Sequence, residues 1–311
     1  MNPNAPLIIL KRRLIILIAS ALTASACLQA QQLTTSGTFL DVFSPEVPVG
    51  VTVGQGVSHT FDSNLKNGVP GDVSVTRLET TVSYRKAWEQ NRLNVTFNYE
   101  YSDYDWSGGA PRFFGDTNSL SLNAIYQYQF DDSDWGAYMI GTVNLGAESG
   151  DVSLTSGDSY VASVGASYEF FKGFTLSFGA LFISNPEQAN QYWPVAFIDW
   201  RINEYLTLRT FNGATLVYDV FADTETVLDF TVQYNSRVVR LNAQPVPAVG
   251  PGNYNPAMEE ESVSASAGVT HKFGGPFYVR GYVQGDFFRE FEFRAGGNKY
   301  QTIKADPGIS L

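Results

Sequence analysis

Apolar and polar residues alternate with a period of two along most of the chain after Asp72. Between Leu93 and Tyr101 every odd-numbered residue is apolar or aromatic, and the residues between them are polar. A period of two is typical of a β-strand with one apolar and one wet face. The pattern recurs in residues 120–130, 160–170, 174–182, 196–202, 228–234 and 263–269. Helical spacing over three turns is absent after residue 30, so the pattern predicts an all-β protein.

The length of these segments and of their connections favours a membrane barrel. A tilted strand needs about 9–11 residues to cross a bilayer, whereas strands in soluble domains average about 5–6. Tight connections are expected at residues 87–91, 131–134, 171–173, 203–204 and 274–276, and longer ones at 103–116, 148–159, 185–192 and 242–261. Because outer-membrane barrels combine short periplasmic turns with long external loops, we predict a transmembrane antiparallel up-and-down β-barrel.

Twelve strands are expected to begin near residues 73, 92, 117, 135, 159, 174, 194, 205, 224, 237, 262 and 277. Both ends of such a barrel lie in the periplasm, which requires a further upward strand within residues 33–60 and a downward one near Tyr300. The expected total is therefore 12 to 14 strands. The barrel is predicted to occupy residues 73–311, and residues 31–72 to form an N-terminal segment leading into it.

Aromatic residues flank the predicted tight turns. They are Tyr84, Trp88, Phe130, Trp135, Phe170, Phe171, Phe174, Trp200, Tyr205, Phe273 and Phe277. A second group lies beside the long loops: Tyr101, Tyr104, Trp106, Tyr160, Tyr192 and Trp193. Rings of this kind form girdles at the two membrane interfaces of a barrel, and both groups are expected to do so.

The first thirty residues have the composition of a secretion signal. Basic residues 11–13 precede an apolar run at 14–19 and small residues up to Ala30. A helix needs about 20 apolar residues to span a membrane, and this run is shorter. We therefore predict a signal peptide over 1–30 and a mature start at Gln31. The alternative is cleavage before Cys27 with acylation of that cysteine, although Ala24 stands where a lipoprotein signal usually has a larger apolar residue. The expected location is the cell outer membrane.

Composition agrees with a membrane protein that does not bind nucleic acid. Charged residues make up 16% of the chain and aromatic residues 14%, whereas soluble domains carry about 25% charged residues. The formal net charge of −11 repels phosphate backbones. Cys27 is the single cysteine, which excludes an internal disulfide.

These features together resemble the uncharacterised outer-membrane β-barrel families of Gram-negative-type envelopes. The resemblance implies outer-membrane lipid and the barrel-assembly machinery as partners, and it brings no catalytic motif. Such barrels usually end in a strand closing on Phe or Trp that the assembly machinery reads, whereas residues 306–311 are Asp, Pro, Gly, Ile, Ser and Leu. Either Phe287 to Phe293 form the final strand with a tail beyond it, or the chain lacks its last residues.

Catalytic and metal-binding motifs are sparse. His59 follows Ser58, a pairing that in envelope lipases activates a nucleophile, but no nucleophile elbow or His-x-Ser-Asn-Gly run accompanies it. We therefore interpret His59 and His271 as strand-end residues. Residues 131–134 and 259–261 offer carboxylates for Ca²⁺, but they also suit a turn and a solvated loop, which we prefer. Residues 101–108 mix aromatic rings with carboxylates, a composition that suits sugar binding, but an aromatic belt at the membrane interface explains the same rings without a ligand. No enzymatic activity, cofactor or metal site is predicted.

Ionisable residues on the polar face of the strands are the main functional candidates, because in a barrel they point into the lumen. They are Arg77, Glu79, Glu100, Glu169, Asp199, Arg209, Asp229, Arg280 and Asp286. Such residues either lock into a salt-bridged plug or form a constriction that selects small solutes by charge. Since carboxylates outnumber arginines among them, a water-filled path would favour cations.

Three hypotheses for the whole molecule follow. Barrels of about 8 strands are filled by side chains, and those of 16–18 are open, so 12 to 14 strands lie between. The first hypothesis is a channel or uptake barrel for small solutes. The second is a structural or surface-interaction barrel without transport, and the third is an envelope enzyme with His59 near a nucleophile at one rim. The alternative at the level of the fold is a soluble exported β-sandwich that binds a ligand.

Overall fold

The computed structural model describes residues 50–311 except 151, 212, 224 and 274–276. The predicted signal peptide, Cys27 and the predicted tight turn at 274–276 lie outside the described residues. Among the residues that are described, no helix is both long and apolar enough to cross a membrane.

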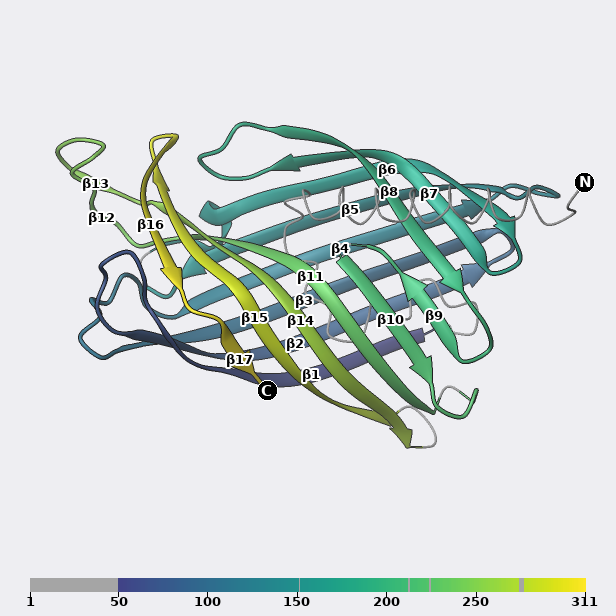
Figure 1. Cartoon of the computed structure of the whole chain (residues 1–311). Helices are drawn as coiled ribbons and strands as arrows, with labels where there is room; N and C mark the ends of the chain where they lie inside the picture. The colour runs from purple at the N-terminus through teal and green to yellow at the C-terminus, as the bar shows by residue number, and fades with distance from the viewer. Residues whose placement is uncertain (1–49, 151, 212, 224, 274–276) are drawn as a thin grey trace, which may run out of the picture.

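The described chain is almost entirely β-structure (Figure 1). Its strands are β1 (Gly50–Asn64), β2 (Asp72–Trp88), β3 (Asn91–Ser107), β4 (Thr117–Gln129), β5 (Trp135–Glu148), β6 (Asp158–Phe171), β7 (Phe174–Ser184), β8 (Gln191–Arg201), β9 (Leu206–Arg209), β10 (Gly213–Asp219), β11 (Thr226–Arg240), β12 (Gln244–Pro245), β13 (Asn253–Tyr254), β14 (Ala257–Phe273), β15 (Phe277–Ala295), β16 (Asn298–Ala305) and β17 (Gly308–Ser310). A short 3-10 helix, η1 (Leu154–Gly157), precedes β6. The strands β12 and β13 form a separate small hairpin.

Antiparallel pairing of neighbours in sequence order closes the large sheet into a ring. The last strand, β17, pairs with β1 through Ser310 and Thr60, and also with β15. With β16 and β17 counted as one interrupted strand, the ring has 14 strands. The prediction of an all-β, antiparallel up-and-down barrel of 12 to 14 strands is therefore confirmed. We call the end with the short connections after β2, β4, β6 and β8 the turn end, and the opposite end the loop end.

Two strand boundaries differ from those predicted. The strand expected to begin near residue 237 is the continuation of β11, whose apolar alternation is interrupted by polar Asn235 and Ser236. The strand β10 was not predicted, because β9 and β10 have only four and seven residues and show no long alternation. The expected upward and downward end strands correspond to β1 and β16, so a barrel strand lies within the predicted N-terminal segment.

The two faces of the wall differ as strand periodicity requires. Large apolar side chains on the outer face are exposed, among them Val51 (66%), Val164 (61%) and Phe230 (51%). Small polar side chains pair across strands on the inner face, for example Ser83 with Thr96 (3.1 Å) and Asn123 with Thr142 (2.7 Å). Closure of the ring pairs most strand edges within the sheet, and an apolar exterior suits lipid, as spanning a membrane with strands requires.

Two rings expected in the loop-side girdle lie inside the barrel instead. Tyr104 is 3% exposed and Trp106 packs beside it in an apolar cluster. Even-numbered residues of β3 face the lumen, so these rings have the same orientation as Glu100. Phe174, expected in the turn-side girdle, is also buried, and its ring stacks on Phe171.

The loop end of the lumen is filled. Its apolar cluster comprises Leu65, Val73, Val75, Tyr104, Phe114, Val239, Leu241, Met258, Phe291, Phe293, Ile303 and Ala305. The strand β11 bends inward and its Arg240 forms a parallel bridge with Ala147 of β5, on the other side of the ring. Gly146 permits this contact, because a side chain there would collide with the carbonyl of Val238. The barrel is therefore pinched at its loop end.

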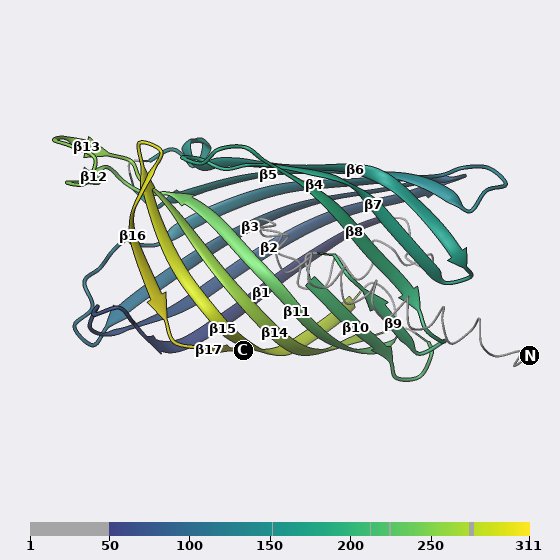
Figure 2. The same ribbon diagram turned by 45° about the horizontal axis from the view of Figure 1, so that its top comes forward.

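Pairing between neighbouring strands is interrupted at two places in the described wall. The hairpin β9–β10 is short, so residues 191–197 of β8 and 234–240 of β11 have no pairing with each other, and we call this place the β8–β11 gap. Figure 2 shows β8 and β11 diverging beyond the short strands. The second interruption lies between β1 and β15 on the turn side of β17, where the hydroxyl of Tyr278 approaches Gly54.

Candidate functional site

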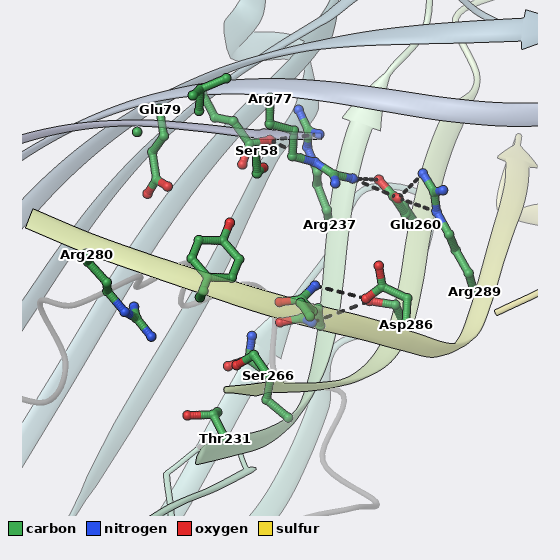
Figure 3. Close-up of a pocket in the computed structure, with 18 residues that line it drawn as sticks. Ser58, Arg77, Glu79, Thr231, Arg237, Glu260, Ser266, Arg280, Asp286 and Arg289 are labelled. Atoms are coloured by element: carbon green, nitrogen blue, oxygen red, sulfur yellow. Dashed lines mark hydrogen bonds and ion pairs between the residues drawn. The ribbon is translucent and has the colours of Figure 1, made fainter. Parts of the chain in front are cut away.

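The lumen contains two cavities that differ in chemistry. The first, of about 170 Å³, is lined by polar and charged residues of β1, β2, β3, β11, β14 and β15, and we call it the charged cavity (Figure 3). The second, of about 440 Å³, is lined by residues of β3 to β9 near the turn end, and we call it the turn-end cavity. The first cavity is thus lined mainly by charged and polar groups, whereas the second combines polar groups with aromatic and aliphatic side chains.

Glu260 of β14 is the centre of an ion-pair cluster at one end of the charged cavity. Arg77 donates to both of its carboxylate oxygens, at 2.9 and 3.1 Å. Arg289 contacts it through Nε at 3.0 Å and Nη2 at 2.9 Å, and the hydroxyl of Tyr104 donates to it at 2.7 Å. Figure 3 shows both arginines converging on this carboxylate. Glu260 is 7% exposed and Arg289 3%, so these charges are removed from water and depend on each other.

Arg237 extends the cluster across the lumen. From β11 its Nη1 reaches Glu100 of β3 at 2.9 Å, and its guanidinium donates to hydroxyls of β3 and β4. The acceptors are Ser102 (2.8 Å), Tyr104 (3.1 Å), Thr117 (2.8 Å) and Ser119 (2.9 Å). Below we use "the Glu260 cluster" for Arg77, Glu100, Tyr104, Arg237, Glu260 and Arg289. Because it joins β2, β3, β11, β14 and β15, the cluster fixes opposite walls of the barrel to each other.

The other charged residues of this half form smaller contacts. Asp229 pairs with Arg280 at 2.7 Å. Asp286 accepts from Gln284 at 3.0 Å, and Glu79 accepts from Thr81 at 3.3 Å.

The turn-end cavity combines aromatic and aliphatic side chains with polar and charged groups. Tyr138, Phe197 and Phe211 line it, with ring centroids 5.8 Å apart for Tyr138 and Phe197 and 4.6 Å apart for Phe197 and Phe211. Asp199 and Arg209 face each other at 3.6 Å on its wall. The volume of this cavity lies within the range of about 300–1,000 Å³ that is typical of small-molecule pockets.

The nine lumen candidates are distributed between the two cavities. Arg77, Glu79, Glu100, Arg280 and Asp286 line the charged cavity, with Asp229 beside Arg280, and Glu169, Asp199 and Arg209 line the turn-end cavity. Only Arg77 and Glu100 belong to the Glu260 cluster. Glu169 accepts a hydrogen bond from the backbone N–H of Gly173 at 2.9 Å and so also supports a tight turn.

Five further inner-face residues were not predicted from the sequence: Arg85, Arg92, Arg237, Glu260 and Arg289. The first three lie an even number of positions from a predicted lumen residue of the same strand. Strand alternation alone could therefore have assigned them to the inner face. Arg289 has the opposite parity to Asp286, because the pairing of β14 with β15 shifts at a bulge between them. Together with the nine candidates, these residues give a set of seven arginines and seven carboxylates, so the excess of carboxylates among the candidates does not extend to this larger set.

The remaining candidates from the sequence lie apart from one another. The Nδ1 of His59 contacts Thr76 at 3.0 Å on the outer face, whereas Ser58 lines the charged cavity on the inner face. His271 contacts Thr226 at 2.9 Å. The prediction of a solvated loop at residues 259–261 is wrong, because these glutamates lie in β14. Glu260 points inward, and its neighbours in sequence face the other side of the strand. Within the described residues, no group of three or more His, Cys, Asp or Glu side chains is placed to hold a metal ion.

The β7–β8 connection carries a pH-sensitive contact outside the strands. Glu187 accepts from Arg240 at 2.8 Å and from the N–H of Gly297 at 2.6 Å. Burial alone would raise the pKa of Glu187, but these two partners lower it by more than burial raises it. The pKa therefore lies below its ordinary value. The stability from this contact is present above the pKa of an unfolded glutamate and is lost as the pH falls through the lowered pKa.

Amide hydrogen exchange measured over a range of acidic pH tests this contact. Protection of residues 185–190, corrected for intrinsic exchange rates, is expected to decline as the pH falls through the lowered pKa of Glu187. The variant Glu187→Gln is expected to have lower protection at neutral pH and no such decline. Identical corrected profiles for the two proteins would contradict the assignment.

Comparison with known proteins finds similarity of fold alone. No family model and no curated protein matches the sequence. Among solved structures, the β domain of the Bordetella autotransporter BrkA is similar over 84% of this chain and 97% of its own, with 10% identity and a TM-score of 0.35. A deletion mutant of the TodX monoaromatic hydrocarbon channel is similar over 85% and 90%, with 9% identity and a TM-score of 0.40. A mutant Rh. blastica porin is similar over 84% and 99%, with 8% identity and a TM-score of 0.23. These proteins are outer-membrane β-barrels, and similarity at this level transfers no activity to the present chain.

Proposed function

We propose that this protein is an integral outer-membrane β-barrel that holds small solutes in a lumen cavity near its turn end and does not conduct ions freely. The observation that carries the proposal is a cavity of about 440 Å³ inside a closed ring whose outer face is apolar. A barrel with only a structural role has no need of such a cavity.

The charged half of the lumen supports the second part of the proposal. Glu100, Asp229 and Glu260 are each paired with arginine, and the apolar cluster fills the loop end above them. An ion that entered this half would have to displace buried partners, and each such separation is costly. We therefore infer that the Glu260 cluster acts as a plug, while solutes occupy the opposite half.

The barrel itself is tested by extraction and electrophoresis. The protein is expected to leave the membrane only with detergent and to migrate faster on a gel before heating than after, since a closed barrel keeps its compact fold in cold detergent. Recovery in the soluble periplasmic fraction, with no effect of heating, would contradict the proposal and favour the soluble β-sandwich.

A further inference from the structure

The inner face of the wall on the loop side of β6 to β8 carries an apolar cluster, although strand alternation predicts polar residues there. Val161, Leu181, Ile183 and Val195 form a cluster on this face, and each is at most 9% exposed. The outer face of the same strands is apolar as well, with Val164 and Phe178 exposed. This part of the barrel therefore has an apolar surface towards both the lipid and the lumen.

Phe197 connects this cluster to the turn-end cavity. Its ring packs against the β6–β8 cluster and also against a second cluster of Ile125, Tyr138 and Ile140. Phe211, at the tip of the β9–β10 hairpin, packs on Phe197 with centroids 4.6 Å apart. The apolar inner surface is thus continuous from the loop side of β8 to the turn-end cavity, with this ring pair between the two.

The β8–β11 gap lies beside the same surface. On one side, residues 191–197 of β8 pair with β7 alone, and on the other, residues 234–239 of β11 pair with β14 alone. Pro194 suits this place because proline occurs mainly in edge strands, where it removes no ladder hydrogen bond. The β9–β10 hairpin bounds the gap on the turn side, and the contact of Glu187 with Arg240 bounds it on the loop side.

The interruption between β1 and β15 has a different chemistry. Its inner side belongs to the charged cavity, where Arg280 and Gln284 of β15 face Ser58 of β1. An apolar molecule would meet buried charges at this place, whereas at the β8–β11 gap the β8 side offers aliphatic and aromatic side chains, with polar Asn235 and Ser236 on the β11 side. The two breaks in pairing therefore differ in what they can admit.

We propose that the turn-end cavity binds a small molecule with an apolar body of one or two rings and a polar end, and that this molecule enters from the lipid through the β8–β11 gap. The body packs against Tyr138, Phe197 and Phe211, and the polar end lies towards Arg92 and Gln127 on the cavity wall. The contact of Phe197 with Phe211 closes the route between gap and cavity. The assignment rests on the proposed function, since it requires an intact barrel in a membrane.

Binding of 1-naphthol to the full chain in lipid vesicles tests the cavity. Saturable binding is expected, and Ser177→Trp and Ile140→Phe, which fill the cavity, are each expected to weaken it about tenfold. Phe178→Ala, one residue from Ser177 but on the outer face, is the matched control and is expected to leave the affinity unchanged. The heat-dependent gel shift of each variant establishes that it has folded. Equal affinity in folded filling variants and wild type would overturn the cavity assignment.

The route is tested by the rate of naphthol binding. Phe211→Ala is expected to accelerate association several-fold, whereas Gln129→Trp, which narrows the cavity at the turn end, is expected to leave the rate unchanged. Slower entry in Gln129→Trp with no effect of Phe211→Ala would show entry from the aqueous turn end and overturn the lateral route. A normal gel shift without naphthol binding would refute this inference while leaving the barrel itself intact, and loss of the gel shift in wild type would refute both.

Discussion

Replacing Glu260 with alanine is expected to lower the free energy of unfolding by about 3–5 kcal/mol, because Arg77 and Arg289 then remain buried without their common partner. Both guanidiniums contact the same carboxylate at about 3 Å, and Tyr104 donates its hydroxyl to it as well. The midpoint of unfolding in urea, followed by the heat-dependent gel shift in detergent, measures the change.

Ser266 provides a matched control, because it lies on β14 with Glu260 and also lines the charged cavity. Ser266→Ala lies outside the Glu260 cluster and is expected to change the free energy of unfolding by less than about 0.5 kcal/mol. A destabilisation by Glu260→Ala no larger than that of Ser266→Ala would show that the cluster does not hold the barrel together, and the interpretation of this half as a plug would fail.

Phe291→Ala is the second substitution with a large expected effect. Its ring is fully buried in the loop-end cluster, with centroids 5.9 Å from Trp106 and 6.0 Å from Phe114. Truncation of a fully buried phenylalanine typically costs about 3–5 kcal/mol, through lost burial and the cavity left behind. The same unfolding measurement applies.

Phe287→Ala is the control for this truncation, since Phe287 lies on the same strand and is 64% exposed. It removes the same atoms without leaving a buried cavity, so its effect is expected to be well below that of Phe291→Ala. Equal effects of the two substitutions would contradict a packed loop end.

The wall of the barrel could be predicted from the sequence because one physical rule acts along its whole length. Lipid outside and water inside impose a period of two, and residues 93–101 of β3 show it without interruption. The same rule assigned the inner face of Arg77, Glu100 and Asp229. It fails where a bulge changes parity, which is why Arg289 was missed beside the predicted Asp286.

The interior could not be predicted, because it depends on contacts between distant strands. Nothing in the local sequence pairs Arg237 with Glu100, which are brought together by the inward bend of β11. The apolar cluster on the inner face of β6 to β8 does have a local signal in the sequence. Residues 180–183 and 193–198 are continuous apolar runs in place of alternation. Such runs are typical of strands with two apolar faces.

Thiol labelling of single-cysteine variants tests the central proposal most directly, because Cys27 is the chain's single native cysteine and its replacement by serine leaves a background without thiols. In protein reconstituted in lipid vesicles, a small charged methanethiosulfonate is expected to label Ser177→Cys, which lines the turn-end cavity, and to spare Phe178→Cys, which faces lipid. Ser102→Cys, buried at the Glu260 cluster, is expected to be spared as well. Equal labelling at 177 and 178 would contradict a membrane barrel, and labelling at 102 as fast as at 177 would contradict a lumen that is closed in its charged half and accessible at the turn end.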